Sequence, residues 1–110
     1  MELVALGTNA LATAQMLKAG ANRGASGENA ICRTVFRSDC VTGPLGITWA
    51  NAMLGEVTAA MAEAVMSCPS PKVILPLFQE EVAMVGLTRE PLPHLVQEAV
   101  EKIREVIEHV

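Results

Sequence analysis

The sequence predicts an α/β fold built on an open, mostly parallel sheet with helices on both faces. Short apolar runs that end in Gly/Pro turns, such as Cys40–Thr42 before Gly43-Pro44, are typical of buried parallel strands. Helical segments alternate with these runs along the chain, as the crossovers of a parallel sheet require. Hydrophobic residues make up 51% of the chain, enough for a core, while aromatic residues make up only 3%. Aliphatic side chains must therefore fill that core.

The length of 110 residues suits a single domain, residues 1–110. The net charge of −4 and the scarcity of aromatic rings argue against nucleic-acid binding, which needs basic stripes or stacking platforms. The N-terminus lacks a basic segment of the signal-peptide type. Asn51, Glu56 and Glu63 interrupt the longest apolar stretch, which argues against a membrane span. We expect a cytoplasmic protein that binds neither membrane nor nucleic acid.

The chain opens with a predicted strand, Glu2–Leu6, followed by the turn Gly7-Thr8-Asn9. Thr8 or Asn9 is suited to cap the helix that we predict over Ala10–Ala19, and Gly20 ends it. Few polar residues interrupt this helix, so it should be buried on more than one side.

Small residues predict a loop over residues 21–27, after which Ser26 caps a predicted helix over Gly27–Phe36. Glu28 favours the first turn of that helix. The only basic cluster consists of Arg23, Arg33 and Arg37, and it is interpreted as solvated surface, with an anion-binding rim as the alternative.

After the strand Cys40–Thr42, helical character runs from about Ile47 to Met66 and is interrupted at Gly55. Thr58 is suited to cap its second piece, Ala59–Ser67. A strand is predicted over Lys72–Leu77, although Pro76 cannot donate to a ladder. A further strand over Val82–Gly86 would make a β-hairpin or a bend with it.

The last predicted helix spans Pro93–His109, because apolar residues recur there at helical spacing through Val110. Glu98 and Lys102 are placed for an i,i+4 ion pair. His94 and His109 lie at the two ends of this helix and are interpreted as surface residues.

Three cysteines, Cys32, Cys40 and Cys68, sit in or beside apolar runs without the paired spacing of a metal site. They are interpreted as reduced small hydrophobic residues. A reactive thiol at Cys68, near a helix end, is the alternative.

Several phrases along nearly the whole chain resemble a bacterial family of uncharacterised small proteins, domain-of-unknown-function family 3842. They are GTNALATAQMLKAGANRGASGENAI, GPLGITWANAMLGEVTAAMAEAV and the closing VGL, PL and EAVEKI. The resemblance implies a Rossmann-like fold and leaves the chemistry undefined. The segment Phe78-Gln79-Glu80-Glu81 departs from the family pattern, at positions expected to face a ligand.

The resemblance also implies a strand, a glycine-rich loop and a helix before Met1, so the predicted fold is N-terminally incomplete. The missing strand would be central, and without it the strands Glu2–Leu6 and Ser38–Thr42 must pair with each other or expose edges. We expect the reading frame to begin upstream of Met1. A rearranged sheet, or a strand supplied by a partner, is the alternative.

Ligands of open α/β sheets bind beyond the carboxyl ends of the strands, where free backbone amides accept anions. Two predicted turns lie at such ends, and Asn51 is a buried amide that needs a partner in the backbone or a ligand. The predicted ligand-binding residues are Gly7, Thr8, Asn9, Thr42, Gly43, Gly46 and Asn51. Glu28, Asn29 and Glu56 border the same region, with capping preferred for the first two.

The leading hypothesis for function is a small-ligand module that binds a nucleotide or another anionic metabolite. The alternative is an interaction or regulatory protein that forms a homo-oligomer and has no small-molecule site. No catalytic triad, metal triad or P-loop lysine stands out, so the sequence supports no enzyme activity, cofactor or metal.

Overall fold

The computed structural model describes residues 1–108 and confirms the α/β class. His109 and Val110, predicted to close the last helix and its apolar stripe, lie outside the described residues. The strands are β1 (Val4–Gly7), β2 (Arg23–Ser26), β3 (Val41–Pro44) and β4 (Lys72–Leu75). The helices are α1 (Ala10–Lys18), α2 (Glu28–Thr34), α3 (Ala59–Ser67) and α4 (Leu92–Glu108), with 3-10 turns η1 (Val35–Arg37) and η2 (Leu45–Thr48).

The strands form two separate sheets of two parallel strands each, β1–β2 and β3–β4. Val4 pairs with Arg23 in the first sheet and Val41 with Lys72 in the second. Within residues 1–108 no ladder joins β1 to β3. Parallel pairing is thus confirmed, whereas one continuous sheet is not formed. Of the two expected outcomes, direct pairing of the first and third strands is not seen within the described residues.

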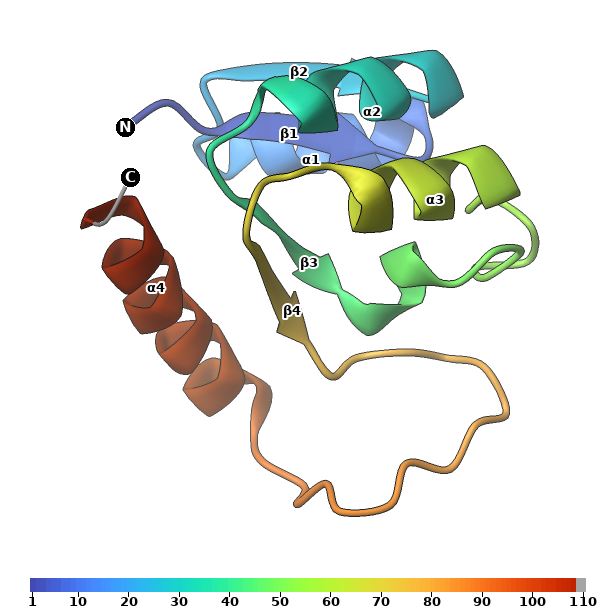
Figure 1. Ribbon diagram of the computed structural model, residues 1–110, viewed down its shortest axis with the longest axis vertical. Coiled ribbons are helices and arrows are strands. Elements are labelled where there is room, and N and C mark those ends of the chain that lie inside the picture. The colour runs from blue at the N-terminus through green and yellow to red at the C-terminus, as the bar shows by residue number, and fades with distance from the viewer. Residues whose placement is uncertain (109–110) are drawn as a thin grey trace.

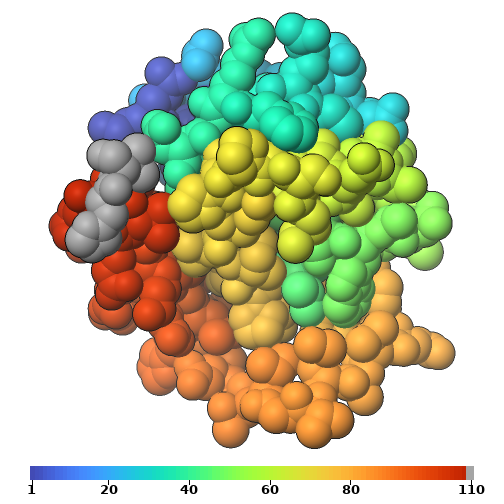
Figure 2. Space-filling view, viewed as in Figure 1, coloured from blue at the N-terminus to red at the C-terminus, as the bar shows by residue number. Residues whose placement is uncertain are grey.

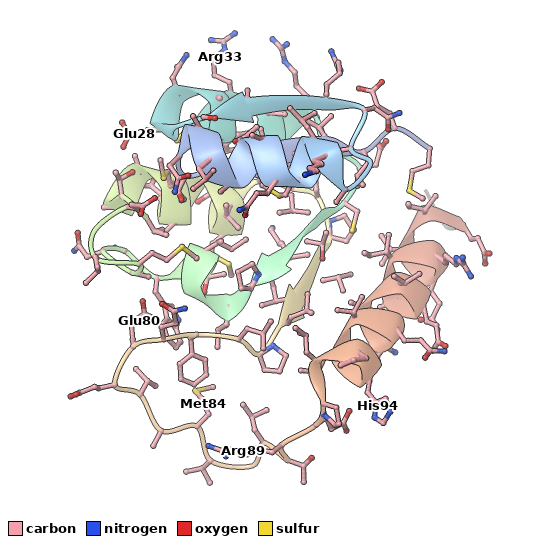
Figure 3. The ribbon with its side chains drawn as sticks, turned by 180° about the vertical axis from the view of Figure 1, so that it is seen from behind. Glu28, Arg33, Glu80, Met84, Arg89 and His94 are labelled. Carbon is pink, nitrogen blue, oxygen red and sulfur yellow. The ribbon has the colours of Figure 1, made fainter. Side chains whose placement is uncertain are left out.

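Helices cover both faces of the first sheet. Figure 1 shows α2 and α3 in front of the strands and α1 behind β1, and Figure 3, seen from behind, brings α1 to the front. In Figure 2, α4 lies at the left margin and residues 76–91 form the lower edge of the molecule. Contacts tie α1 to β1 and β2, and α4 to β4. The core therefore lies between the strands and the α2–α3 layer.

That core bridges the two sheets. Its buried members come from α2, η1, α3 and the loop before α3: Ile31, Val35, Ala52, Val57, Met61, Ala62, Ala64, Val65 and Cys68. Leu6 of β1 and Val41 of β3 both pack against this cluster. Side-chain packing, rather than backbone pairing, therefore holds the two sheets together.

Two glycines allow α1 to lie very close to the first sheet. A Cβ atom at Gly7 would meet the Thr13 hydroxyl, and one at Gly24 would meet the Thr13 methyl group and Leu17. Thr13 is the only buried residue of α1, and its hydroxyl donates to the carbonyls of Asn9 or Ala25, each 3.2 Å away. The expectation that α1 is buried on several sides is wrong, because Leu11, Met16 and Leu17 are exposed.

The loop predicted over residues 21–27 contains strand β2, which the sequence reasoning missed. Its residues Arg23–Ser26 are all exposed and include a glycine, so they carry no apolar signal. Ser26 does not cap α2. Its hydroxyl donates to Thr13 Oγ1 at 2.8 Å, and Gly27 is the N-cap residue, without a side-chain hydrogen bond.

The prediction of a helix from Ile47 is wrong for residues 47–58, because α3 begins only at Ala59. Residues 45–48 form the 3-10 turn η2, and residues 50–56 form turns. Asn51, Met53 and Leu54 have positive φ angles of 69°, 57° and 56°, the left-handed region that L-residues avoid. The second piece is confirmed: α3 spans Ala59–Ser67, and the Thr58 hydroxyl accepts the Met61 amide at 3.2 Å.

Strand β4 ends at Leu75, directly before Pro76, so the predicted end at Leu77 is two residues too long. Val82–Gly86 forms no strand, and the expected hairpin is wrong. This segment is exposed and has no strand partner within the described residues, and residues 85 and 86 form a turn in which Val85 is 100% exposed. The final helix is confirmed as α4, but the ion pair of Lys102 is to Glu105 at 3.8 Å rather than to Glu98.

The N-cap of α3 should be measurable in the stability of the whole chain. Replacement of Thr58 by Ala leaves the first-turn amide of Met61 without its acceptor, so we expect a loss of about 1 kcal/mol in the free energy of unfolding in urea. Thr58→Ser keeps the hydroxyl and should lie near wild type. Equal stabilities of the Ala and Ser variants would contradict this role.

A substitution at Leu54 should stabilise the folded protein. Its side chain is fully exposed and its φ is positive, so it adds backbone strain without packing. We expect Leu54→Asn to raise the free energy of unfolding by about 1 kcal/mol, because Asn tolerates the left-handed region. Leu11→Asn, a matched change on exposed helix α1, should instead destabilise. A loss of stability in both variants would argue against strain at residue 54.

Candidate functional site

The carboxyl end of β1 is joined to the loop before α3 by one carboxylate. Thr8 Oγ1 and Asn9 Nδ2 both donate to Glu56 Oε1, at 3.0 and 2.7 Å. Residue 8 directly follows β1, and Glu56 lies between β3 and α3 in the sequence. The turns after β1 and β3 therefore lie at the same edge of the molecule, as an open α/β sheet predicts.

Asn9 holds two roles at this edge. Its Oδ1 caps α1 by accepting the Ala12 amide at 2.8 Å, while its Nδ2 points to Glu56. The amides of Ala10 and Leu11 donate to no group of residues 1–108. Because unsatisfied first-turn amides carry partial positive charge, the Glu56 carboxylate occupies a position that favours an anion.

The electrostatics of Glu56 follow from these contacts. The hydrogen bond from Asn9, and next the one from Thr8, lower the pKa of the Glu56 carboxyl below its ordinary value, against a small opposing effect of burial. Hydrogen bonds that favour the charged form act in this direction. Glu56 is exposed, so solvent screens this effect.

The residues predicted around β3 have mostly structural contacts. Thr42 and Gly43 belong to β3 and pair with Val73 and Ile74. A Cβ atom at Gly43 would meet Ile47 Cδ1 at 2.7 Å, so glycine lets η2 fold back on the strand. Gly46 is buried in η2, and its carbonyl accepts the Trp49 amide at 3.1 Å.

Asn51 is exposed, so the expected buried amide is wrong. Its backbone N–H donates to the Val57 carbonyl at 2.6 Å, and its carbonyl accepts the Gly55 amide at 3.0 Å. Its φ of 69° explains the residue type, because Asn is enriched in the left-handed region. Asn51 therefore shapes the loop, while its side chain faces solvent.

Two further glutamates fasten the same edge. Glu80 Oε1 accepts the Met53 amide at 2.9 Å, and this contact is the main cause that lowers the pKa of Glu80. Glu28 at the start of α2 accepts the Thr58 hydroxyl. Figure 3 shows Glu28 and Glu80 on the same side of the molecule, and Arg33 pointing outward from α2. Sequence reasoning placed Glu80 in a segment expected to face a ligand but did not choose it as a site residue, and it weighed Glu56 without choosing it.

The described residues give little support to metal binding or to thiol chemistry. Within residues 1–108 no group of His, Cys, Asp and Glu side chains could hold a metal ion. Burial raises the pKa of the Cys32 and Cys40 thiols, which makes them less reactive. Cys68 is buried and donates to the Val65 carbonyl, so the alternative of a reactive thiol is not supported. No described helix has the length and apolar character needed to cross a membrane.

An open cavity of about 490 Å³ lies away from this edge, between β4 and α4. Its lining includes apolar residues such as Ile74 and Ala99 and the charged residues Lys72, Glu98 and Lys102. Helix α4 has no fully buried residue. We interpret the cavity as loose packing of α4 against β4, because none of the described residues of that helix is buried.

The Glu56 contact predicts a pH-dependent stability. A carboxyl whose pKa is lowered on folding stabilises the native state when ionised, so this contribution is lost as pH falls below the ordinary Glu range of about 4.3. The stability difference between wild type and Glu56→Gln should therefore shrink between pH 6 and pH 3. In a Thr8→Ala, Asn9→Ala background, the Gln substitution should no longer alter the pH profile. An unchanged difference across this range would refute the contact.

Comparison with known proteins gives one match. No curated protein and no solved structure is similar enough to match. A family model described as Domain of unknown function (DUF3842) matches residues 1–108. Since the match covers nearly the whole chain, this protein belongs to that family.

Proposed function

We propose that this protein is a cytosolic small-ligand module that binds a nucleotide or another anionic metabolite at the carboxyl ends of β1 and β3. One observation carries the proposal: two side-chain donors, Thr8 Oγ1 and Asn9 Nδ2, converge on a single anionic oxygen beside the first turn of α1. Oxygens of phosphate and carboxylate groups suit the same donors.

In this proposal, the Glu56 carboxylate accepts from the two donors that would otherwise bind the anionic group of the ligand. It lies on a loop of turns, and the residues before it adopt left-handed conformations. Strained loops of this kind are typical of functional sites. An incoming anion displaces the carboxylate and takes both donors together with the free amides of Ala10 and Leu11. Loss of the Glu56 contact opposes binding, so ligand affinity and Glu56 ionisation are linked.

The proposal includes a Rossmann-like arrangement. Parallel pairing in β1–β2 and β3–β4, with α1 and α2 on opposite faces, supports the interpretation that the two sheets are halves of one open sheet. A doubly wound sheet has its strands in the spatial order 3-2-1-4-5, so one parallel pair lies on each side of a central strand. Ligands of such sheets bind at the carboxyl ends of the strands near that centre. The Glu56 contact lies where these two halves meet.

A homo-oligomeric interaction protein without a small-molecule site is the second candidate. Helix α4 supports it, because Leu92, Val96 and Val100 on its apolar stripe are 53%, 47% and 41% exposed. Exposed apolar stripes of this kind favour helix-mediated association.

The two candidates separate in a ligand screen with Glu56 variants. We expect inorganic phosphate or a nucleotide to raise the melting temperature, since a native-state ligand at 100 times its Kd adds about 2.7 kcal/mol. Glu56→Gln removes the competing carboxylate and should tighten anion binding about tenfold, a difference of about 1.4 kcal/mol. Thr8→Ala should weaken binding.

Glu63→Gln, an exposed change of the same charge on α3, serves as the matched control and should bind like wild type. Weaker binding by the Glu56 variant would mean that the carboxylate accepts a ligand hydroxyl, and the displacement step would be wrong. No stabilisation by any compound, together with a concentration-independent oligomer in sedimentation, would favour the second candidate.

A further inference from the structure

Residues 76–91 connect β4 to α4 without a helix or a strand, and their first part is hydrogen-bonded to the carboxyl edge. We call residues 77–81 the strap. Figure 3 shows Glu80 where the strap approaches the loop of turns before α3. Within residues 1–108, no hydrogen bond joins residues 82–91 to any element except the strap and α4. The strap is therefore the anchored end of a long exposed connection.

Three contacts of different kinds fasten the strap. They are a hydrogen bond from the Gly46 amide to the Leu77 carbonyl at 3.4 Å, a ring contact between Trp49 and Phe78, and a hydrogen bond from the Met53 amide to Glu80 at 2.9 Å. The ring centroids are 5.1 Å apart with an interplanar angle of 56°, a favourable arrangement of an aromatic pair. The first hydrogen bond is long, whereas that of Glu80 is charge-assisted. Glu80 therefore makes the strongest directional contact of the strap.

The Glu80 carboxylate lies between the strap and the loop and uses both of its oxygens. Oε1 accepts the Met53 amide, and Oε2 accepts the Gln79 amide at 3.1 Å. One side chain thus joins the backbones of two segments that follow different strands, β3 and β4.

Met53 connects this contact to Glu56. Its N–H donates to Glu80, and its carbonyl accepts the Glu56 amide at 3.1 Å. The Met53 side chain packs on the core cluster, whereas Leu54, Gly55 and Glu56 are exposed. Loss of the Glu80 contact would leave the Met53 side chain in place and free the exposed end of the loop. Relaxation is favourable there, because residues 53 and 54 have strained, positive φ angles.

We propose that the strap controls access to the donors Thr8 and Asn9, because it holds the loop in the conformation that places Glu56 on them. With Glu80 bound to the Met53 amide, Glu56 covers both donors. With the strap released, the loop relaxes and Glu56 withdraws, which leaves the donors to an external anion. The effect on a ligand rests on the function proposed above, whereas the coupling between the strap and Glu56 does not.

The coupling acts in both directions. An anion that displaces Glu56 removes a contact that holds the loop, so it also weakens the contact between the loop and Glu80, by the same factor. Residues 81–91 are exposed, so opening of the strap breaks few buried contacts. Segments of this kind open locally at a low cost in free energy.

Amide exchange in the ligand-free chain tests the coupling. Glu80→Ala removes the acceptor of the Met53 amide, and Glu81→Ala, a truncation of the neighbouring exposed glutamate, is the matched control. The Glu56 amide donates to Met53 and not to Glu80. We expect it to exchange at least tenfold faster in Glu80→Ala and at the wild-type rate in the control. Faster exchange at Met53 alone would overturn the proposal.

The pKa of Glu56, measured by NMR titration, separates this coupling from simple charge repulsion. Withdrawal from Thr8 and Asn9 removes the hydrogen bonds that lower the pKa of Glu56, so we expect it to rise toward its ordinary value in Glu80→Ala. Mere removal of a like charge would instead lower the pKa of Glu56. A lowered or unchanged value would contradict the withdrawal of Glu56.

Trp49 is the only tryptophan of the chain, so its fluorescence reports the position of the strap. Its emission should shift to longer wavelength in Glu80→Ala, as in Phe78→Ala, because the half-buried ring loses its partner. Glu80→Gln keeps an oxygen that can accept the Met53 amide and should restore most of the signal. Unchanged protection of the α3 amides shows that each variant remains folded. A shift in Phe78→Ala without one in Glu80→Ala would mean that Glu80 does not hold the strap.

Inorganic phosphate separates this inference from the proposed function. We expect Glu80→Ala to bind phosphate about tenfold more tightly than Glu81→Ala, a difference of about 1.4 kcal/mol. If no variant binds phosphate but the exchange and the pKa of Glu56 respond as expected, the ligand proposal fails and the coupling stands. If wild type binds phosphate and Glu56 does not respond to Glu80→Ala, the coupling fails and the ligand proposal stands.

Discussion

The packing of α2 against α3 is the constraint on which the rest of this structure depends. Backbone hydrogen bonds build two sheets, and in the described part of the chain no ladder connects them. The apolar cluster around Val35, Val57, Met61 and Val65 is packed by side chains from both halves. Hydrophobic burial is non-directional. It can hold the sheets under one layer without fixing the spacing or register between their facing edges, which backbone pairing would fix.

Directional contacts add a second connection at the carboxyl edge. Glu56 links the first sheet to the loop that follows the second, while Glu80 fastens that loop from the other side through the Met53 amide. Both carboxylates are stabilised in their ionised form, which is consistent with their lowered pKa values. The loop between them holds three left-handed L-residues. These contacts offset local strain, and a ligand that competes for one of them would act on the whole loop.

Sequence reasoning predicted the elements whose signals are local. Thr58 at the N-cap, the apolar period of α4 and the Gly/Pro end of β3 depend on residues within a few positions, and each was placed within about two residues. Strand β2 was missed because its four residues are held by pairing with β1 and by Thr13, both distant in the sequence. The apparent helix over residues 47–57 is apolar enough, but the contacts of Glu56 and Glu80 favour turns there instead.

The strand ends and capping residues of the candidate site could be predicted from the sequence, but the hydrogen bonds made there could not. Strand ends and capping residues are visible in the sequence, and Thr8 and Asn9 indeed meet the loop after β3. The anion that those donors contact is a carboxylate 47 residues away from Asn9 in the sequence. No local sequence pattern encodes a contact at that separation.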